Sequence, residues 1–222
     1  ADYREALELM PKDTSLGLPR LTRDRRYVGE YYERAIKVES VNDIYPCLLG
    51  WRGQQGGGRA EDVKQRVVWE MDHAETIKGA TVLYPTLDAL KSLPGFAAWL
   101  GDVFVDEEST ETLRLAQNLG VKVISSDYSG FDASLHTELL SLCDEVLASW
   151  FTEPGRTRVF LLGEIANRVD LIVPYQRLTG RNGAMPSGSV LTNLRDTICN
   201  LIAGIYAGLK LGTEVARYQV LG

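Results

Sequence analysis

The chain has 222 residues, a formal net charge of −6, and a composition that is 45% hydrophobic and 24% charged. These values are those of an ordinary globular protein with a core large enough for one large domain or two modest ones. No apolar run reaches about 18 residues and no charged-then-apolar leader follows Ala1. The sequence therefore predicts neither a membrane-spanning helix nor a signal peptide.

The charge is distributed unevenly along the chain. Taken whole, a net charge of −6 argues against a nucleic-acid binder. Residues 1–70 are neutral overall, however, whereas residues 71–150 carry a net charge of −9 and residues 151–222 carry +3. The excess of acids is concentrated in the middle of the chain, and the basic residues cluster at its two ends.

The cysteines and histidines do not form a metal-site pattern. Cys47, Cys143 and Cys199 lie far apart, and His73 and His136 do not complete a zinc-ligand spacing with them. We expect all three cysteines to be buried thiols in a reducing compartment. Both histidines are expected at the surface or at the edge of an element.

A turn rich in hydroxyl groups follows a short helix expected over residues 2–10. It reads TSLGLP over residues 14–19, and a run of arginines followed directly by tyrosines comes just after it, over residues 20–32. Cations for phosphates interleaved with aromatic rings for bases are typical of a single-strand nucleic-acid track. A solvated helix whose tyrosines pack inward explains the same composition.

The segment VKQRVVW, residues 63–69, follows the glycine-rich stretch 51–60 and is predicted to be a strand. Alternation places Lys64 and Arg66 on one face of this strand, where two cations could hold a triphosphate. A solvated strand face is the alternative. Residues 71–120 contain no motif that indicates a catalytic or binding site. Within them, an acidic loop over 102–111 is expected to lead into a helix that ends at Gly120.

Two carboxylates stand around a glycine turn in residues 121–135, VKVISSDYSGFDASL. Val121 to Ile124 is predicted to be a short buried strand, with Asp127 at its carboxyl end and Asp132 just before a helix over residues 133–150. Fully extended, the two acids would lie about 17 Å apart, and Gly130 supplies the turn that shortens this distance. Asp127 could bind Mg²⁺, although a solvated strand-end acid and a helix cap at Asp132 remain alternatives.

A mobile polar loop over residues 179–189 is predicted to enter a long helix, after a helix over 156–168 and a strand over 170–176. Leucines and isoleucines from Leu194 to Leu209 make one apolar face of the long helix. Thr192, Asp196 and Asn200 lie together on the opposite face, with groups that can hydrogen-bond a ligand. An exposed polar face with Ser189 as the helix cap is the alternative. Residues 214–221 are predicted to form a final strand.

Together these segments resemble the viral RNA-dependent RNA polymerases. SSDYSGFDASL resembles the family's palm motif A, MPSGSVLTNLRDTICN resembles motif B, VKQRVVW is similar to motif F, and TSLGLP is similar to motif G. Their order, G then F then A then B, is that of the unpermuted family, and YQVLG is similar to the start of the strand that leads to Gly-Asp-Asp. Asp196, nine residues after Ser187, makes the picobirnavirus and partitivirus members the nearest resemblance.

The resemblance implies an α+β right-hand fold with fingers and a partial palm, in which an RRM-like antiparallel palm sheet packs with helices and the thumb is absent. The implied regions are fingers over 1–120, motif A strand and helix over 121–150, a fingers insertion over 151–180, and motif B with the first strand of motif C over 181–222.

The resemblance also implies roles for individual residues. Asp127 is the expected catalytic residue and metal ligand. The expected nucleotide-binding residues are Asp132, Lys64, Arg66, Ser187, Gly188, Thr192, Asp196 and Asn200. The residues expected to contact the RNA template are Thr14, Ser15, Gly17 and Pro19. Asp132 would accept a hydrogen bond from the ribose 2′-hydroxyl, directly or through a helix-face group, which is either Asp196 or Asn200.

The implied activity is template-directed synthesis of RNA from ribonucleoside triphosphates, with two Mg²⁺ ions about 3.5 to 4 Å apart and Mn²⁺ as an alternative metal. The implied partners are the RNA template and the nascent RNA, in the host cytoplasm or the virion interior. The 222-residue chain itself is expected to be inactive, because it stops before the second pair of metal-binding acids. A reverse transcriptase and a non-catalytic RNA-binding viral domain are the alternatives.

Overall fold

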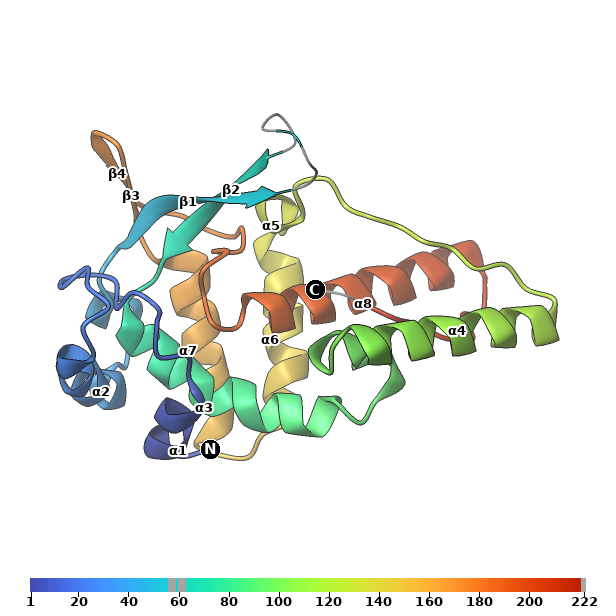
Figure 1. Cartoon of the computed structure of the whole chain (residues 1–222), viewed down its shortest axis with the longest axis horizontal. Helices are drawn as coiled ribbons and strands as arrows, with labels where there is room; N and C mark the ends of the chain where they lie inside the picture. Colours follow the sequence, from blue (N-terminus) through green and yellow to red (C-terminus); the bar gives the residue numbers. More distant parts are fainter. Residues whose placement is uncertain (56–58, 60–62, 221–222) are drawn as a thin grey trace.

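The computed structural model describes residues 1–55, 59 and 63–220, and it combines many helices with one small sheet (Figure 1). In chain order the elements are α1 (Tyr3–Leu9), η1 (Arg25–Tyr27), α2 (Val28–Lys37), η2 (Val41–Asp43), β1 (Cys47–Gln55), β2 (Val63–Glu70), α3 (His73–Leu90), η4 (Pro94–Trp99), α4 (Asp102–Leu119), α5 (Phe131–Ser134), α6 (Thr137–Ser149), α7 (Gly155–Arg168), β3 (Leu171–Val173), β4 (Gln176–Leu178) and α8 (Thr192–Leu211). The predicted α+β class is confirmed.

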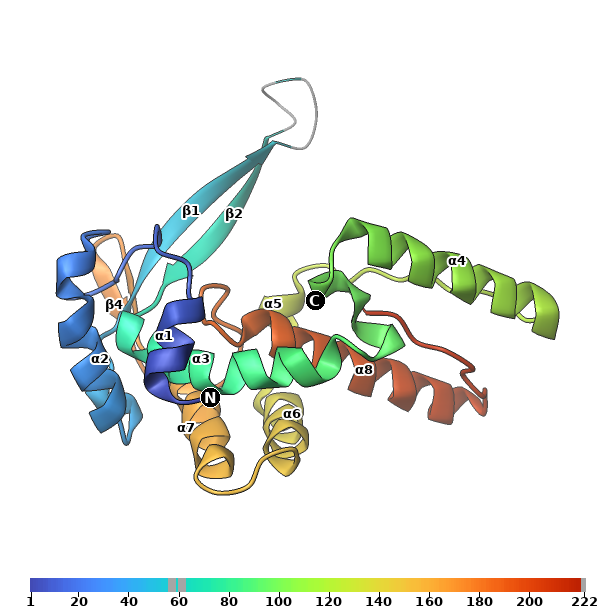
Figure 2. The same cartoon turned by 60° about the horizontal axis from the view of Figure 1, so that its bottom comes forward.

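The sheet has the strand order β2-β1-β3-β4. Strands β1 and β2 form a long antiparallel hairpin, β1 pairs with β3 in parallel, and β3 pairs with β4 antiparallel. The β1–β2 hairpin extends away from the helices (Figure 2). Trp51 and Val67 are paired on it and remain exposed, because none of the described helices covers this part of the hairpin.

Helix α3 organises the amino-terminal half of the chain. Its N-cap is Asp72, whose buried carboxylate accepts hydrogen bonds from Ala74 N at 2.9 Å and Tyr45 N at 3.0 Å. Arg34 of α2 pairs with the same carboxylate. Because the Asp72 carboxylate both caps α3 and forms an ion pair with Arg34, it fixes the start of α3 against α2 and β1.

Two apolar clusters make the core. The first joins α1, α2 and the start of α3 with Cys47 of β1, and the second joins α6, α7 and the start of α8 with the end of α3. All three cysteines are buried, as predicted. On α8 the predicted apolar face is buried at Leu194 and Ile198 but exposed at Ile205 and Leu209, so only its first half is part of the core.

Two predictions on the middle of the chain are wrong. Residues 121–124 form no strand, and Ile124 is 88% exposed; the backbone hydrogen bond from Val121 N to Ala116 O at 3.0 Å closes helix α4 instead. Residues 102–111 are helical rather than a loop, because α4 begins at Asp102, where an acid is favoured by the helix dipole. His73 is the first residue of α3, at the edge of an element as predicted. It is buried, and burial lowers the pKa of its imidazole to about 4, with a smaller contribution from Arg25.

Residues 214–220 also form no strand in the described part of the chain, and the prediction for Leu221 lies outside it. A strand needs a ladder of backbone hydrogen bonds to a neighbour. Here Val220 N donates to Gly95 O at 3.2 Å, while Gln219 and Arg217 bond to α4 through Val105 O and the Glu108 carboxylate. The segment is therefore held between η4 and α4.

Helix α8 is fixed to α6 by a buried ion pair. Arg195, which is 1% exposed, donates from Nε and Nη2 to the two carboxylate oxygens of Asp144, each at 2.9 Å. Burial raises the pKa of Asp144 to about 6, and Arg195 opposes that rise.

Replacing one partner of this pair should be strongly destabilising, because the other charge would stay buried without compensation. We expect Asp144→Ala to lower the free energy of unfolding by about 3–5 kcal/mol. Glu164→Ala is the control, since it breaks the exposed Arg168–Glu164 pair and should cost less than about 1 kcal/mol. Urea unfolding curves of the two variants would measure both, and equal losses would contradict the account.

Candidate functional site

A side-chain contact joins two segments that lie far apart in sequence. Ser187 Oγ donates a hydrogen bond to Asp132 Oδ2. The backbone makes this contact possible, because Met185 N donates to Asp132 O at 2.8 Å and Ala184 N donates to Leu135 O at 3.0 Å. The loop before α8 is therefore bonded to α5 and to Leu135, which follows it, and this places Ser187 within hydrogen-bonding distance of the Asp132 carboxylate.

The turn before α5 separates the two predicted acids. Gly130, at φ 61° and ψ 42°, adopts the left-handed conformation that glycine accepts readily. Asp132 is half-buried, whereas Asp127 is exposed and its Oδ1 accepts from Tyr128 N at 2.9 Å. The structure thus brings Asp132 to the loop before α8 and leaves Asp127 in the exposed segment that returns from α4 to α5 (Figure 1).

Gly188 lies directly against strand β2. A Cβ atom on Gly188 would lie 1.7 Å from Trp69 O, so no other residue fits without moving the loop or the strand. The neighbouring Ser189 is buried and its Oγ donates to Glu75 Oε1 of α3 at 2.7 Å. The loop is therefore attached to β2 and α3 on one side and to α5 on the other.

Thr192 and Arg181 shape the two ends of this loop. Thr192 Oγ1 donates to Pro186 O at 2.7 Å, which turns the chain into α8. Arg181 donates to Gly183 O at 3.0 Å and Ala184 O at 3.1 Å, and its guanidinium lies 4.2 Å from the centre of the Trp69 ring. Neither the role of Arg181 nor that of Glu75 was predicted from the sequence.

Asp196 lies on the first turns of α8 and is only 7% exposed. Its Oδ1 atom is buried with no hydrogen-bond partner among the described residues. Burial, followed by the charge of Asp132 and a hydrogen bond with it, raises the pKa of Asp196 to about 8, and Arg195 opposes the rise. Asp132, Ser187 and Asp196 therefore form one polar cluster, whereas Asn200 is half-buried a turn further along.

Glu75 could not be recognised from its sequence context. It stands three residues after the N-cap Asp72, where a glutamate would be read as part of a helix cap. In the structure it is fully buried, and burial raises its pKa to about 7, while the hydrogen bond from Ser189 opposes the rise.

The predicted cations belong to β2, and the predicted template turn packs on the start of α3. Arg66 is exposed on β2 opposite Arg52, and Lys64 is paired with Gln54 in the strand register, although the Lys64 side chain lies outside the described residues. The turn at residues 14–19 is held to the start of α3, because His73 N donates to Leu16 O at 3.1 Å.

The residues of this turn differ in exposure. Thr14 and Pro19 are exposed, and Ser15 is half-buried. Gly17 adopts a positive φ of 64°, and a Cβ there would lie 2.1 Å from Met71 O. The turn and Glu75 thus both depend on the first turn of α3 for their positions.

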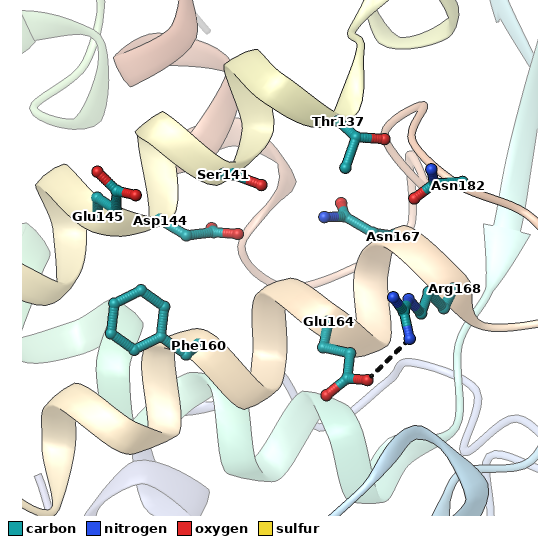
Figure 3. Close-up of a pocket in the computed structure, with 9 residues that line it drawn as sticks. All are labelled: Thr137, Ser141, Asp144, Glu145, Phe160, Glu164, Asn167, Arg168 and Asn182. Carbon is teal, nitrogen blue, oxygen red and sulfur yellow. Dashed lines mark hydrogen bonds and ion pairs between the residues drawn. The ribbon is translucent and has the colours of Figure 1, made fainter.

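A separate polar cavity of about 350 Å³ lies between α6 and α7 (Figure 3). Its lining residues are Thr137, Ser141, Asp144, Glu145, Phe160, Glu164, Asn167, Arg168 and Asn182. Figure 3 shows Asn167 and Asp144 extending between the two helices. None of the predicted site residues lines this cavity.

The described residues do not form a complete metal centre, since no group of three or more His, Cys, Asp or Glu side chains in them could hold an ion. Asp127 fits the part of one magnesium ligand, because its carboxylate is exposed and is paired with no cation in the ion pairs of the described chain. No helix in the described ranges is long and apolar enough for a membrane span.

The fold is that of a viral RNA polymerase segment. The whole chain superposes on crystal structures of the RNA-dependent RNA polymerase of a human picobirnavirus, with TM-scores of 0.80 for an insertion-loop deletion mutant and 0.79 for the enzyme without that deletion. Sequence identity is 24% in both cases, and the chain covers 46% and 44% of those chains.

The sequence comparisons give the family. A model described as viral RNA-dependent RNA polymerase matches residues 1–219, and the chain therefore belongs to this family, as the motif resemblance predicted. It is 35% identical over 180 residues to a potential RNA-dependent RNA polymerase of human picobirnavirus and 29% identical over 220 residues to the RNA-directed RNA polymerase of Cryptosporidium parvum virus 1.

These alignments cover most of this chain but less than half of either relative. They include 79% and 93% of this chain, and they span 33% and 40% of the length of the picobirnavirus and Cryptosporidium virus relatives, respectively. The activity of the whole polymerase is therefore a proposal for this chain.

Neutralising Glu75 should change how stability depends on pH. Its pKa is about 7 in the folded chain and 4.5 in the unfolded chain. Between these pH values the folded chain keeps a proton on Glu75 that the unfolded chain has lost, so the free energy of unfolding falls as the pH rises from about 4.5 to 7. Glu75→Gln keeps an acceptor for Ser189 and removes this loss, on the order of 3 kcal/mol at neutral pH.

The measurement is the free energy of unfolding of wild type and Glu75→Gln at pH 5 and pH 8. The variant should gain stability relative to wild type as the pH rises. A difference between the two proteins that does not change with pH would contradict the burial argument.

Proposed function

We propose that this chain contributes the fingers and part of the palm of an enzyme that copies an RNA template from ribonucleoside triphosphates. Membership of the viral RNA-dependent RNA polymerase family supports RNA synthesis as the activity. The single observation that carries the proposal is the contact between Ser187 and Asp132, because it joins the segments that resemble motifs B and A into one polar site.

In this proposal Asp132 reads the sugar of the incoming nucleotide. Its carboxylate is half-buried and receives the Ser187 hydroxyl, and the remaining lone pairs can accept the ribose 2′-hydroxyl. Thr192 holds the loop through Pro186 O, and either Asp196 or Asn200 supports Asp132 from α8. Gly188 lets the loop lie against β2.

The chemistry we propose is phosphoryl transfer with two magnesium ions, of which this chain would hold one through Asp127. Bound Mg²⁺ supplies charge stabilisation for the attacking and leaving oxygens. Arg66 and Lys64 neutralise the triphosphate from β2, and Thr14, Ser15, Gly17 and Pro19 contact the template. The regions 1–120, 121–150, 151–180 and 181–222 serve as fingers, motif A, fingers insertion and motif B with the start of motif C.

Removing the carboxylate of Asp127 should abolish metal-dependent synthesis. In the polymerase that contains this chain, Asp127→Ala removes a metal ligand, and the loss of several kcal/mol of transition-state stabilisation lowers the rate of nucleotide incorporation by at least about 100-fold. Asp88→Ala is the control, because Asp88 is an exposed acid paired with Lys91 on α3. Mg²⁺-dependent incorporation that is unaffected by Asp127→Ala would refute the assignment.

Removing the carboxylate of Asp132 should instead change the choice of sugar. A hydrogen bond to a charged acceptor is worth about 1.5–3 kcal/mol, so Asp132→Ala should reduce discrimination between ribo- and deoxyribonucleotides by about 10- to 100-fold. Primer extension with each nucleotide type measures this ratio. Unchanged discrimination would leave Asp132 with only a structural role at the start of α5.

A further inference from the structure

Of two neighbouring carboxyl groups in the site, one has a hydrogen-bond donor at its oxygen and the other has a buried oxygen without a donor in the described chain. Asp132 receives a hydrogen bond from the Ser187 hydroxyl. Asp196, which is 93% buried, has a buried Oδ1 atom with no donor in the described chain. An ionised carboxylate without a donor is very costly in such a place, whereas a protonated carboxyl group can itself donate.

Among the described residues, the one cation acting on Asp196 relieves this cost only in part. The charged groups that act on it are Asp132, which repels its negative charge, and the adjacent Arg195. The guanidinium of Arg195 is already bound by both oxygens of Asp144, at 2.9 Å each, and it also donates to Asn167 Oδ1 at 3.3 Å. A proton on Asp196 would supply the compensation that these groups do not.

We propose that Asp132 and Asp196 share a single proton, which Asp196 carries and donates to the Asp132 carboxylate. Two hydroxyl groups, from Ser187 and from protonated Asp196, then fix Asp132 in one orientation and leave it the negatively charged acceptor of the pair. Asp196 is thus a positioning residue for Asp132. Burial and the charge of Asp132 raise the pKa of Asp196 to about 8, so the pair keeps this proton at neutral pH.

The functional consequence rests on the proposed function, in which Asp132 reads the ribose. Above pH 8 the proton leaves, the two carboxylates repel each other, and Asp132 loses one of the two hydroxyl groups that hold it. Sugar discrimination should therefore fall about tenfold between pH 7 and pH 9, in proportion to the protonated fraction of Asp196. Asp196→Asn carries a permanent donor and should make the discrimination independent of pH over this range.

The proton itself can be observed in the 222-residue chain without any activity. Selective ¹³C labelling of aspartate carboxyl groups, followed by NMR titration from pH 4 to pH 9, should give one group with a midpoint near pH 8. This titration should be absent in Asp196→Asn. In Asp132→Asn, which removes the neighbouring charge, the midpoint of Asp196 should fall, and this second variant tests the pairing if Asp196→Asn does not fold.

The outcomes separate this inference from the proposed function. The shared proton is overturned if no aspartate titrates above pH 7, or if Asp132→Asn leaves the midpoint unchanged. Either result says nothing about the ribose role of Asp132, which the sugar-discrimination assay tests. A titration near pH 8 together with sugar discrimination that Asp132→Ala does not alter supports the shared proton and refutes the ribose role. Discrimination that falls with pH equally in wild type and Asp196→Asn overturns the positioning role of Asp196.

Discussion

The site depends on two backbone hydrogen bonds that attach the loop before α8 to α5 and its end. Met185 N to Asp132 O and Ala184 N to Leu135 O bring together segments about 50 residues apart in sequence. Because these bonds are between backbone groups, they fix the path of the loop whatever its side chains are. The Ser187 contact with Asp132 follows from that path, and the buried Asp196 stands near Asp132 on the first turns of α8.

A second constraint is that the loop and the first turns of α8 are held by buried ionisable groups. Glu75 accepts a hydrogen bond from Ser189, Asp144 forms an ion pair with Arg195, and Asp196 lies beside Asp132. Burial raises the pKa of Glu75, Asp144 and Asp196. Each of these groups is costly to ionise where it stands, so each has a specific partner or retains a proton. The loop is consequently linked to α3, and α8 to α6 and to Asp132, through groups whose charge depends on pH.

The sequence predicted the elements whose periodicity is local. Helices α1, α6, α7 and α8 and the β2 strand were predicted from the local sequence pattern, and the segments resembling motifs A and B contain the residues that meet at Asp132 and Ser187. The segment 121–124 was wrongly predicted to be a buried strand. An apolar run alone cannot reveal whether a neighbouring strand is there to pair with it. Glu75 was missed because its partner, Ser189, lies 114 residues away.

The central claim is that Ser187 and Asp132 act as one unit in recognising the sugar. The most direct measurement is a double-mutant cycle of Asp132→Ala and Ser187→Ala on the ratio of ribo- to deoxyribonucleotide incorporation in the polymerase that contains this chain. The account predicts a coupling energy of about 0.5–3 kcal/mol, so that the double variant discriminates little worse than Asp132→Ala alone. Two effects that add independently would contradict it.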